Sequence, residues 1–159
     1  MQRHSHSLLL VHIVWATGER SPILGPRADA WLARLLRHRA YEAGGLLLAV
    51  GNAADHVHVL VRYPSTACVA TVVQRLKGAS SHAWNAALPA RPDRSRLSWQ
   101  AGYWAESVSP KDLPAVIGYV EGQRRHHGEA REPEAWEAVL HEDHSVGGGG
   151  RHVIPRCPM

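Results

Sequence analysis

Two histidines separated by a single valine, His56 and His58, lie within the apolar run DHVHVLVRY at residues 55–63. The β-branched and apolar residues of this run predict a strand, in which alternate side chains face opposite sides. Both imidazoles therefore project from one face, roughly 7 Å apart at Cα, and can bind one divalent ion together. An isolated pair of this kind is also found as two half-exposed histidines on the open face of a sheet, so the pair alone does not establish a metal site.

A tyrosine and a glutamine, Tyr119 and Gln123, lie four residues apart in the segment VIGYVEGQRRHH. This segment is predicted to be helical, and the spacing places both side chains on one helix face. A tyrosine can act as a covalent nucleophile, and a glutamine carbonyl can complete an oxygen and nitrogen shell for Mg²⁺ or Mn²⁺. The spacing is equally compatible with Tyr119 as a core aromatic whose hydroxyl reaches the surface.

The elements that must position these residues follow the order strand, helix, strand, strand, helix, strand, helix. Apolar periodicity and turn residues predict them at 7–16, 27–43, 46–52, 56–63, 65–88, 98–109 and 110–127. The two central strands form a hairpin, and Ser65 or Thr66 is expected to cap the second helix. This order predicts an α+β, ferredoxin-like (RRM-like) fold, with an antiparallel sheet and the helices packed on one face. The first strand, apolar on both faces, is expected to be a sheet edge where two subunits meet.

The composition of the 159-residue chain is typical of one globular domain, with 45% hydrophobic and 20% charged residues. No stretch is long enough to span a bilayer, and the apolar start lacks the cleavage site of a signal peptide. Cys68 and Cys157 lack CxxC spacing, so we expect no disulfide framework and a cytoplasmic location. The sequence pI of about 9.5 and the excess of arginine over lysine favour a polyanionic partner.

Three segments together resemble one known family: DHVHVLV, VVQRLKGASS and WQAGYWAESVSPKDLPAVIGYVEGQRRHH. They are similar, in the same order, to segments of the single-tyrosine HUH transposases of small bacterial insertion sequences, the IS-two-hundred-like family. The resemblance runs from about Ser7 to His127. The aromatic-glycine segment followed by a helix with the pattern YxxxQ is its most specific part.

This resemblance implies a ferredoxin-like fold and metal-dependent cleavage and rejoining of single-stranded DNA with hairpin ends. It assigns His56, His58 and Gln123 as ligands of Mg²⁺ or Mn²⁺, and Tyr119 as the nucleophile that becomes joined to a 5′ phosphate. It also implies a homodimer in which each active site takes its histidines from one subunit and its tyrosine helix from the other. Residues 1–128 would form the transposase domain, 129–145 a short C-terminal helix and 146–159 a flexible glycine-rich tail.

Further candidates for contact with DNA are basic or aromatic residues outside the central motifs. For each, a solvated surface position or a core position is the competing interpretation. These residues are Arg20, Arg75, Lys77 and Tyr103. His12 is interpreted as a sheet histidine rather than a ligand, and His126 and His127 as complements of a helix dipole.

Three other functions are considered. A histidine-triad hydrolase requires a third alternating histidine where this chain has Leu60, and relaxases or replication initiators usually have longer chains. A domesticated, catalytically silent DNA-binding protein of the same fold is the remaining alternative. The presence of all four expected site residues argues against it, and a covalent protein–DNA adduct would distinguish the two.

Overall fold

The computed structural model describes residues 6–127 and 136–137 of the chain. Its centre is one four-stranded antiparallel sheet in the order β2-β3-β1-β4. The strands are β1 (Leu9–Ala16), β2 (Leu46–Asn52), β3 (His56–Tyr63) and β4 (Trp104–Ser107). The helices are α1 (Asp29–Glu42), α2 (Val69–Ala86), α3 (Leu113–Glu121) and α4 (Gln123–His126), with short 3-10 turns at Gly18–Arg20, Pro26–Ala28, Leu88–Ala90 and Pro110–Asp112.

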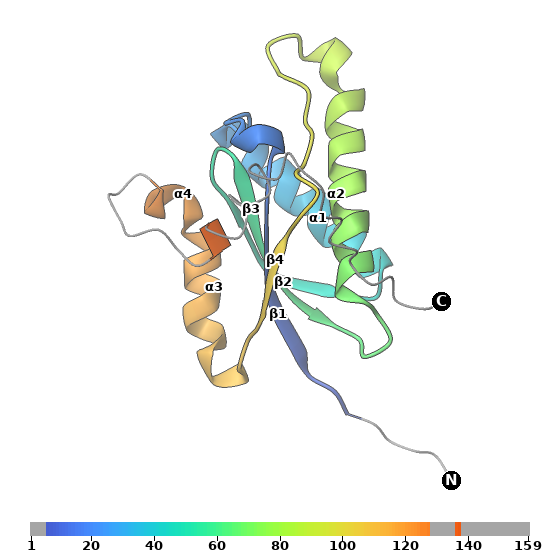
Figure 1. Ribbon diagram of the computed structural model, residues 1–159, viewed down its shortest axis with the longest axis vertical. Helices are drawn as coiled ribbons and strands as arrows, with labels where there is room; N and C mark the ends of the chain where they lie inside the picture. The colour runs from blue at the N-terminus through green and yellow to red at the C-terminus, as the bar shows by residue number, and fades with distance from the viewer. Residues whose placement is uncertain (1–5, 128–135, 138–159) are drawn as a thin grey trace, which may run out of the picture.

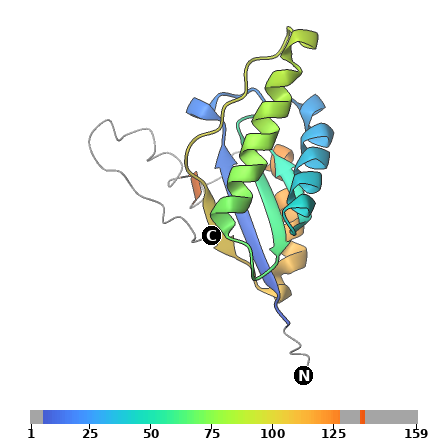
Figure 2. The same ribbon diagram turned by 90° about the vertical axis from the view of Figure 1, so that its right-hand side faces the viewer.

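The helices form two layers on opposite sides of the sheet. Helices α1 and α2 cover one face, and α3 with α4 lies against the other (Figure 1). In the view turned by 90°, α1 and α2 lie side by side in front of the sheet and α3 lies behind it (Figure 2). The chain therefore has three layers, and the tyrosine helix is separated from α1 and α2 by the sheet.

Strand alternation decides which side chains enter each layer. On the α1 and α2 side, Ile13, Trp15, Val57, Val59 and Val61 are buried in the main core with Leu32, Leu36, Val72, Val73 and Leu76. On the other side, Leu60 and Ala49 pack with Val120 of α3 in a second apolar cluster. The register pairs Val14 with His58 and Ala16 with His56, so both histidines lie on this second face.

The ferredoxin-like sheet and the β2–β3 hairpin confirm the predicted fold class, and the bounds of β2 and β3 agree with the prediction. Two expectations about the faces and edges are wrong. Strand β1 is central, because it pairs with both β3 and β4, so the sheet edges are β2 and β4. The helices do not all pack on one face of the sheet, since α3 covers part of the opposite face, which carries the histidines.

The second helix begins later than predicted, and its capping residue differs. Helix α2 starts at Val69 with Cys68 at the N-cap, so neither Ser65 nor Thr66 caps it. Cys157 and the predicted segments 129–145 and 146–159 lie outside the described residues, apart from Trp136 and Glu137, so the expectation of no disulfide framework stays a prediction. Within the described part of the chain, no helix is long and apolar enough to cross a membrane.

Candidate active site

The two histidines of β3 are completely buried, and each has one ring nitrogen engaged within the protein. His56 Nδ1 donates to the Asp55 carboxylate at 2.7 Å. His58 Nδ1 lies 2.9 Å from His12 Nε2, which reaches it diagonally from β1. Because the Asp55 carboxylate can only accept, His56 Nδ1 carries the proton, which leaves a lone pair on His56 Nε2 for a ligand. The contact with His12 orients the His58 ring, and either ring of that pair can supply the shared proton.

Asp55 links the histidines to a cation from the first loop. Its carboxylate also pairs with Arg20, whose Nε lies 2.9 Å from Oδ2. Burial pushes the pKa of the Asp55 carboxyl upward, but the hydrogen bond from His56 and the charges of His56, Arg20 and His127 outweigh it and hold that pKa below its ordinary value. Asp55 therefore stays ionised and orients the His56 ring.

Arg20 lies at the rim of the site, and both its backbone conformation and its side-chain contacts are unusual. It adopts φ 55°, a left-handed conformation that is unfavourable for a residue with a side chain. The guanidinium lies over the ring of Trp136, 5.6 Å from its centroid. Its buried Nη1 has no hydrogen-bond partner among the described residues. This donor has the chemistry required to bind a phosphate oxygen.

Tyr119 projects from α3 onto the same face of the sheet as the histidines. Its ring centroid lies 5.5 Å from that of His58 and 5.8 Å from that of His12. The helix is brought this close by Gly51 of β2, where a Cβ atom would lie only 1.7 Å from the Val120 carbonyl oxygen. The absence of a side chain at Gly51 therefore sets the distance between the tyrosine helix and the sheet.

Gln123 and His127 continue the stripe that Tyr119 begins, at spacings of four residues. Gln123 is 1% exposed; its Nε2 donates to the Tyr119 carbonyl, and its buried Oε1 has no hydrogen-bond partner within residues 6–127 and 136–137. One ligand atom each from His56, His58 and His127 lie within 4.8 Å of one another. These nitrogen donors and an unsatisfied amide oxygen fit a divalent metal ion.

Two tryptophans complete the surroundings of the histidines. Trp104 of β4 contacts His12 edge to face, with the ring centroids 5.4 Å apart. Trp136 is 2% exposed and packs on His56 and His58 at centroid distances of 4.7 and 5.1 Å. Its indole nitrogen lies 3.4 Å from the Tyr119 hydroxyl. The site is therefore an aromatic enclosure around two imidazoles and a phenol.

Three of the predicted DNA contacts lie away from this site. The Lys77 ammonium donates to the carbonyls of Gln100, Ala101 and Gly102 and so holds the loop before β4. Arg75 is exposed on α2, on the opposite side of the sheet from the histidines. Tyr103 packs against the main core, and burial raises its pKa, which agrees with the core interpretation. Among the predicted DNA contacts, only Arg20 reaches the histidine site.

Sequence reasoning missed four residues of the site. His127 was interpreted as a complement of a helix dipole, Trp136 was not considered, Trp104 was passed over for its neighbour Tyr103, and Asp55 received no role. One signal was present in the sequence, because His127 follows Gln123 at the spacing that links Gln123 to Tyr119. The position of Trp104 opposite Val14, on the histidine face, depends on the register of β4 with β1, which the structure shows. No local signal identifies Trp136.

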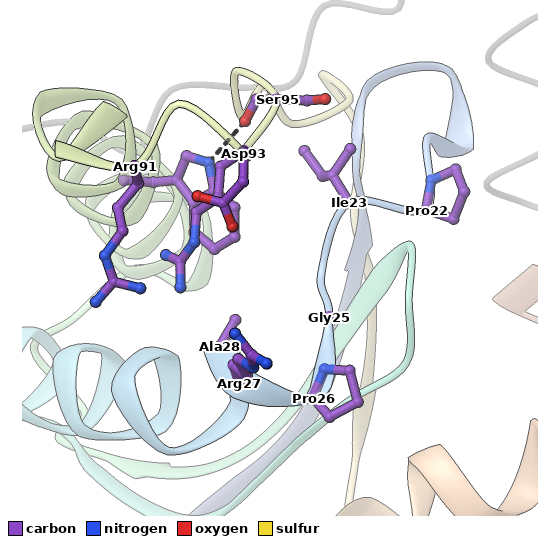
Figure 3. Close-up of a pocket in the computed structure, with 11 residues that line it drawn as sticks. Pro22, Ile23, Gly25, Pro26, Arg27, Ala28, Arg91, Asp93 and Ser95 are labelled. Atoms are coloured by element: carbon purple, nitrogen blue, oxygen red, sulfur yellow. Dashed lines mark hydrogen bonds between the residues drawn. The ribbon is translucent and has the colours of Figure 1, made fainter. Parts of the chain in front are cut away.

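A separate hollow of about 460 Å³ lies between the loop after β1 and the loop after α2 (Figure 3). Arg27, Arg91 and Arg94 line it together with a single acidic residue, Asp93. Arg94 lies over the ring of Trp84, whose indole nitrogen donates to the Ser95 carbonyl. The hollow contains none of the predicted catalytic or metal-binding residues, but its arginines make it basic.

The family of this chain is established by comparison with known proteins. The model of the family described as transposase IS200 like matches residues 5–123, a range that includes His56, His58, Tyr119 and Gln123. Because the match covers most of the chain, the chain belongs to the IS200-like transposase family. The predicted family is therefore confirmed.

Individual relatives agree with this assignment. The chain is 25% identical over 114 residues to the ISDra2 transposase TnpA of Deinococcus radiodurans, an alignment that covers 70% of this chain and 81% of the relative. A crystal structure assigned as a transposase of Deinococcus radiodurans matches with a TM-score of 0.60 and 28% identity, over 78% of this chain and 97% of the other. The REP-associated tyrosine transposase bound to a REP hairpin shares the fold, with a TM-score of 0.56 and 15% identity over 80% and 75% of the two chains.

Proposed function

We propose that this transposase cleaves and rejoins single-stranded DNA with hairpin ends through a 5′-phosphotyrosine at Tyr119, with Mg²⁺ or Mn²⁺ held by His56, His58 and Gln123. The observation that carries the proposal is the edge-to-face contact of the Tyr119 ring with His58, at a centroid distance of 5.5 Å, in a site where buried His56 Nε2 and Gln123 Oε1 have no hydrogen-bond partner among the described residues. A nucleophile beside unsatisfied ligand atoms is the arrangement that metal-assisted phosphoryl transfer requires.

In the proposed reaction, the Tyr119 oxygen attacks phosphorus in line with the departing 3′ oxygen. The bond from Tyr119 Oη to phosphorus forms as the bond from phosphorus to the 3′ oxygen breaks, and the phenolic proton is lost to solvent while the 3′ oxygen takes one up. A bound divalent ion would polarise the phosphate and stabilise the charge that develops on its oxygens. Because the phosphotyrosine keeps one phosphodiester bond, a 3′-hydroxyl from another end can reverse the step and join two strands without ATP.

Residues around the site have defined parts in this proposal. Asp55 and His12 hold the two imidazole rings in orientation. The unsatisfied Nη1 of Arg20 is suited to a phosphate oxygen of the cleaved strand. Trp136 contacts both histidines and the Tyr119 hydroxyl, so it separates the unreacted phenol from water.

The surface also supports a nucleic-acid partner. The hollow lined by Arg27, Arg91 and Arg94 is formed in part by the loop that also carries Arg20, and its guanidinium groups are suited to DNA phosphates. Hairpin DNA is the first substrate to test, because a protein of the same fold is bound to a REP hairpin. Arg75 remains a proposed phosphate contact on the far side of the sheet, and we propose a cytoplasmic homodimer as the working form.

A covalent adduct assay tests this function. A single-stranded oligonucleotide labelled at its 3′ end should become attached to the wild-type protein in a denaturant-resistant form, whereas a 5′ label should be released on a fragment with a 3′-hydroxyl. Tyr119→Phe should form no adduct. Tyr41→Phe is the matched control, because Tyr41 is 75% exposed on α1 and lies on the opposite side of the sheet from the site.

The outcomes separate the enzyme from a silent DNA-binding protein. Hairpin binding without any adduct, in the presence of Mg²⁺ or Mn²⁺, would support the silent protein of the same fold. An adduct that persists in Tyr119→Phe would assign the nucleophile to another residue.

A further inference from the structure

A third imidazole lies beside the two histidines of β3. His127, at the end of α4, contributes one ring nitrogen to a group in which the ligand atoms of His56, His58 and His127 all lie within 4.8 Å of one another. Its ring centroid lies 4.4 Å from that of His56. The first two rings are fully buried, and His127 is half-buried at the rim.

The helix geometry explains how His127 reaches this position. Backbone hydrogen bonds run from Gly122 to the Gly118 carbonyl, from His126 to the Gly122 carbonyl and from His127 to the Gln123 carbonyl, so α3 and α4 continue one another through Gly122. Residues at 119, 123 and 127 therefore share one face, the face that packs toward the sheet. His127 is the last residue of this stripe.

We propose that His127 is a third protein ligand, so that the metal centre contains three imidazoles and binds a transition-metal ion such as Mn²⁺, Co²⁺ or Zn²⁺ in preference to Mg²⁺. This inference rests on the proposed function for the ligand roles of His56 and His58, and it adds the third ligand and the metal class. Mg²⁺ favours oxygen ligands and retains its waters, whereas imidazole nitrogen suits later transition ions. Three imidazoles therefore shift the preference of the site away from Mg²⁺.

The spacing requires a modest adjustment. Two nitrogen ligands at about 2.1 Å from one ion lie roughly 3.0–3.4 Å apart at the 90–110° angles of octahedral or tetrahedral coordination. The present limit of 4.8 Å must therefore shorten by roughly 1.5 Å, a movement that rotation of the half-buried His127 ring at the helix end can supply. Asp55, in contact with His56 and electrostatically coupled to His127, adds a fixed negative charge beside the ion.

The proposal is tested by metal binding, without reference to cleavage. The full-length chain is stripped of metal with a chelator and titrated with Co²⁺, followed by its visible absorption, and then with Mg²⁺ by calorimetry. We expect His127→Ala to weaken Co²⁺ binding by at least about tenfold, a lower bound taken from the loss caused by removing outer-shell partners of a metal. Its Mg²⁺ affinity should change less than about twofold, because Mg²⁺ gains little from an imidazole.

Two further variants keep the result interpretable. His126→Ala removes the neighbouring imidazole, which is not part of the three-histidine group, and should bind Co²⁺ as the wild type does. His127→Gln keeps a side chain of similar length and offers an amide oxygen in place of the imidazole nitrogen. It should therefore narrow the difference between the Co²⁺ and Mg²⁺ affinities. Thermal unfolding of each metal-free variant checks that the fold is intact.

The outcomes distinguish this inference from the proposed function. If His56→Ala and His58→Ala lose Co²⁺ binding while His127→Ala binds as tightly as the wild type, the third ligand is overturned and the histidine pair stands. If all three variants bind as the wild type does, the metal assignment in the proposed function fails as well. Equal Co²⁺ and Mg²⁺ affinities in the wild type would overturn the proposed metal class.

Discussion

His12 Nε2 lies 2.9 Å from His58 Nδ1, so two imidazoles on neighbouring strands share one buried hydrogen bond. The rings stack with their centroids 5.1 Å apart and their planes 24° from parallel. This contact fixes the rotation of the His58 ring about its side-chain bonds. It therefore determines which nitrogen of His58 faces the tyrosine helix.

Replacing His12 should affect metal binding through His58, without removing a ligand. We expect His12→Ala to weaken metal binding about ten- to 100-fold, as loss of an outer-shell partner does. It should also lower the free energy of unfolding by about 1–3 kcal/mol, because a buried ring nitrogen of His58 loses its partner. Calorimetric metal titration and urea unfolding measure the two effects. The exposed His82→Ala on α2 should change neither, and unchanged metal affinity in His12→Ala would contradict the orienting role.

Gly51 should not tolerate even a methyl group. A Cβ atom at this position would lie 1.7 Å from the Val120 carbonyl oxygen, so Gly51→Ala must push α3 away from the sheet. We expect a loss of about 1–3 kcal/mol in the free energy of unfolding, together with loss of adduct formation.

The control is Gly118→Ala on the exposed side of α3, where an added Cβ atom meets nothing within 4 Å. That control should stabilise the chain by about 0.5–1 kcal/mol through helix propensity. Equal changes in the free energy of urea unfolding for Gly51→Ala and Gly118→Ala would refute the close-packing argument.

Arg124 of α4, which continues the tyrosine helix α3, forms hydrogen bonds with the beginning of α1 and the loop before it. Its Nε donates to Asp29 Oδ2 at 2.6 Å, its Nη2 donates to the Leu24 carbonyl at 2.7 Å, and Asn52 donates to the same carboxylate. The charged pair is about one-third exposed, so Arg124→Ala should cost no more than about 1 kcal/mol of stability. A misplaced nucleophile should slow adduct formation more strongly, about ten- to 100-fold. The control is Arg125→Ala, because Arg125 is the exposed neighbour of Arg124. Its single-turnover rate of adduct formation should match that of the wild type.

The origin of the tyrosine in each active site can be tested by mixing variants. In the described chain, α3 packs against its own sheet and Tyr119 lies beside its own histidines, which differs from the shared arrangement that the resemblance implies. This geometry predicts that a heterodimer of His56→Ala and Tyr119→Phe stays inactive, because each chain contains one damaged component. Recovery of cleavage in heterodimers purified with two different tags would instead establish exchange of the tyrosine helix between subunits.

The sequence predicted the histidine face correctly because strand alternation is a local property. Once β3 was recognised, His56 and His58 had to share a side, as the register with β1 shows. The pattern of Leu113, Val116, Ile117 and Val120 likewise indicates a helix with one apolar face. It does not indicate which sheet face this helix covers, so the histidine face was expected to be open.

The order of strands and the residues that meet across the site could not be derived from local patterns. Strand β1 is apolar on both faces, which suits an edge in a dimer as well as the central position that it occupies. The contact between His12 and His58 depends on the register of β1 with β3, and the position of Trp136 depends on a distant part of the chain. Such contacts are set by packing between elements rather than by the propensity of any segment.

The packing of Trp136 also gives the site an optical property. Its indole lies against His56 and His58, whereas Trp31 and Trp84 belong to the side of the sheet covered by α1 and α2. A paramagnetic ion bound by the histidines would quench the fluorescence of this indole more strongly than that of the distant ones. The difference between wild-type and Trp136→Phe spectra therefore isolates an intrinsic fluorophore that reports directly on occupancy of the site, with no label attached.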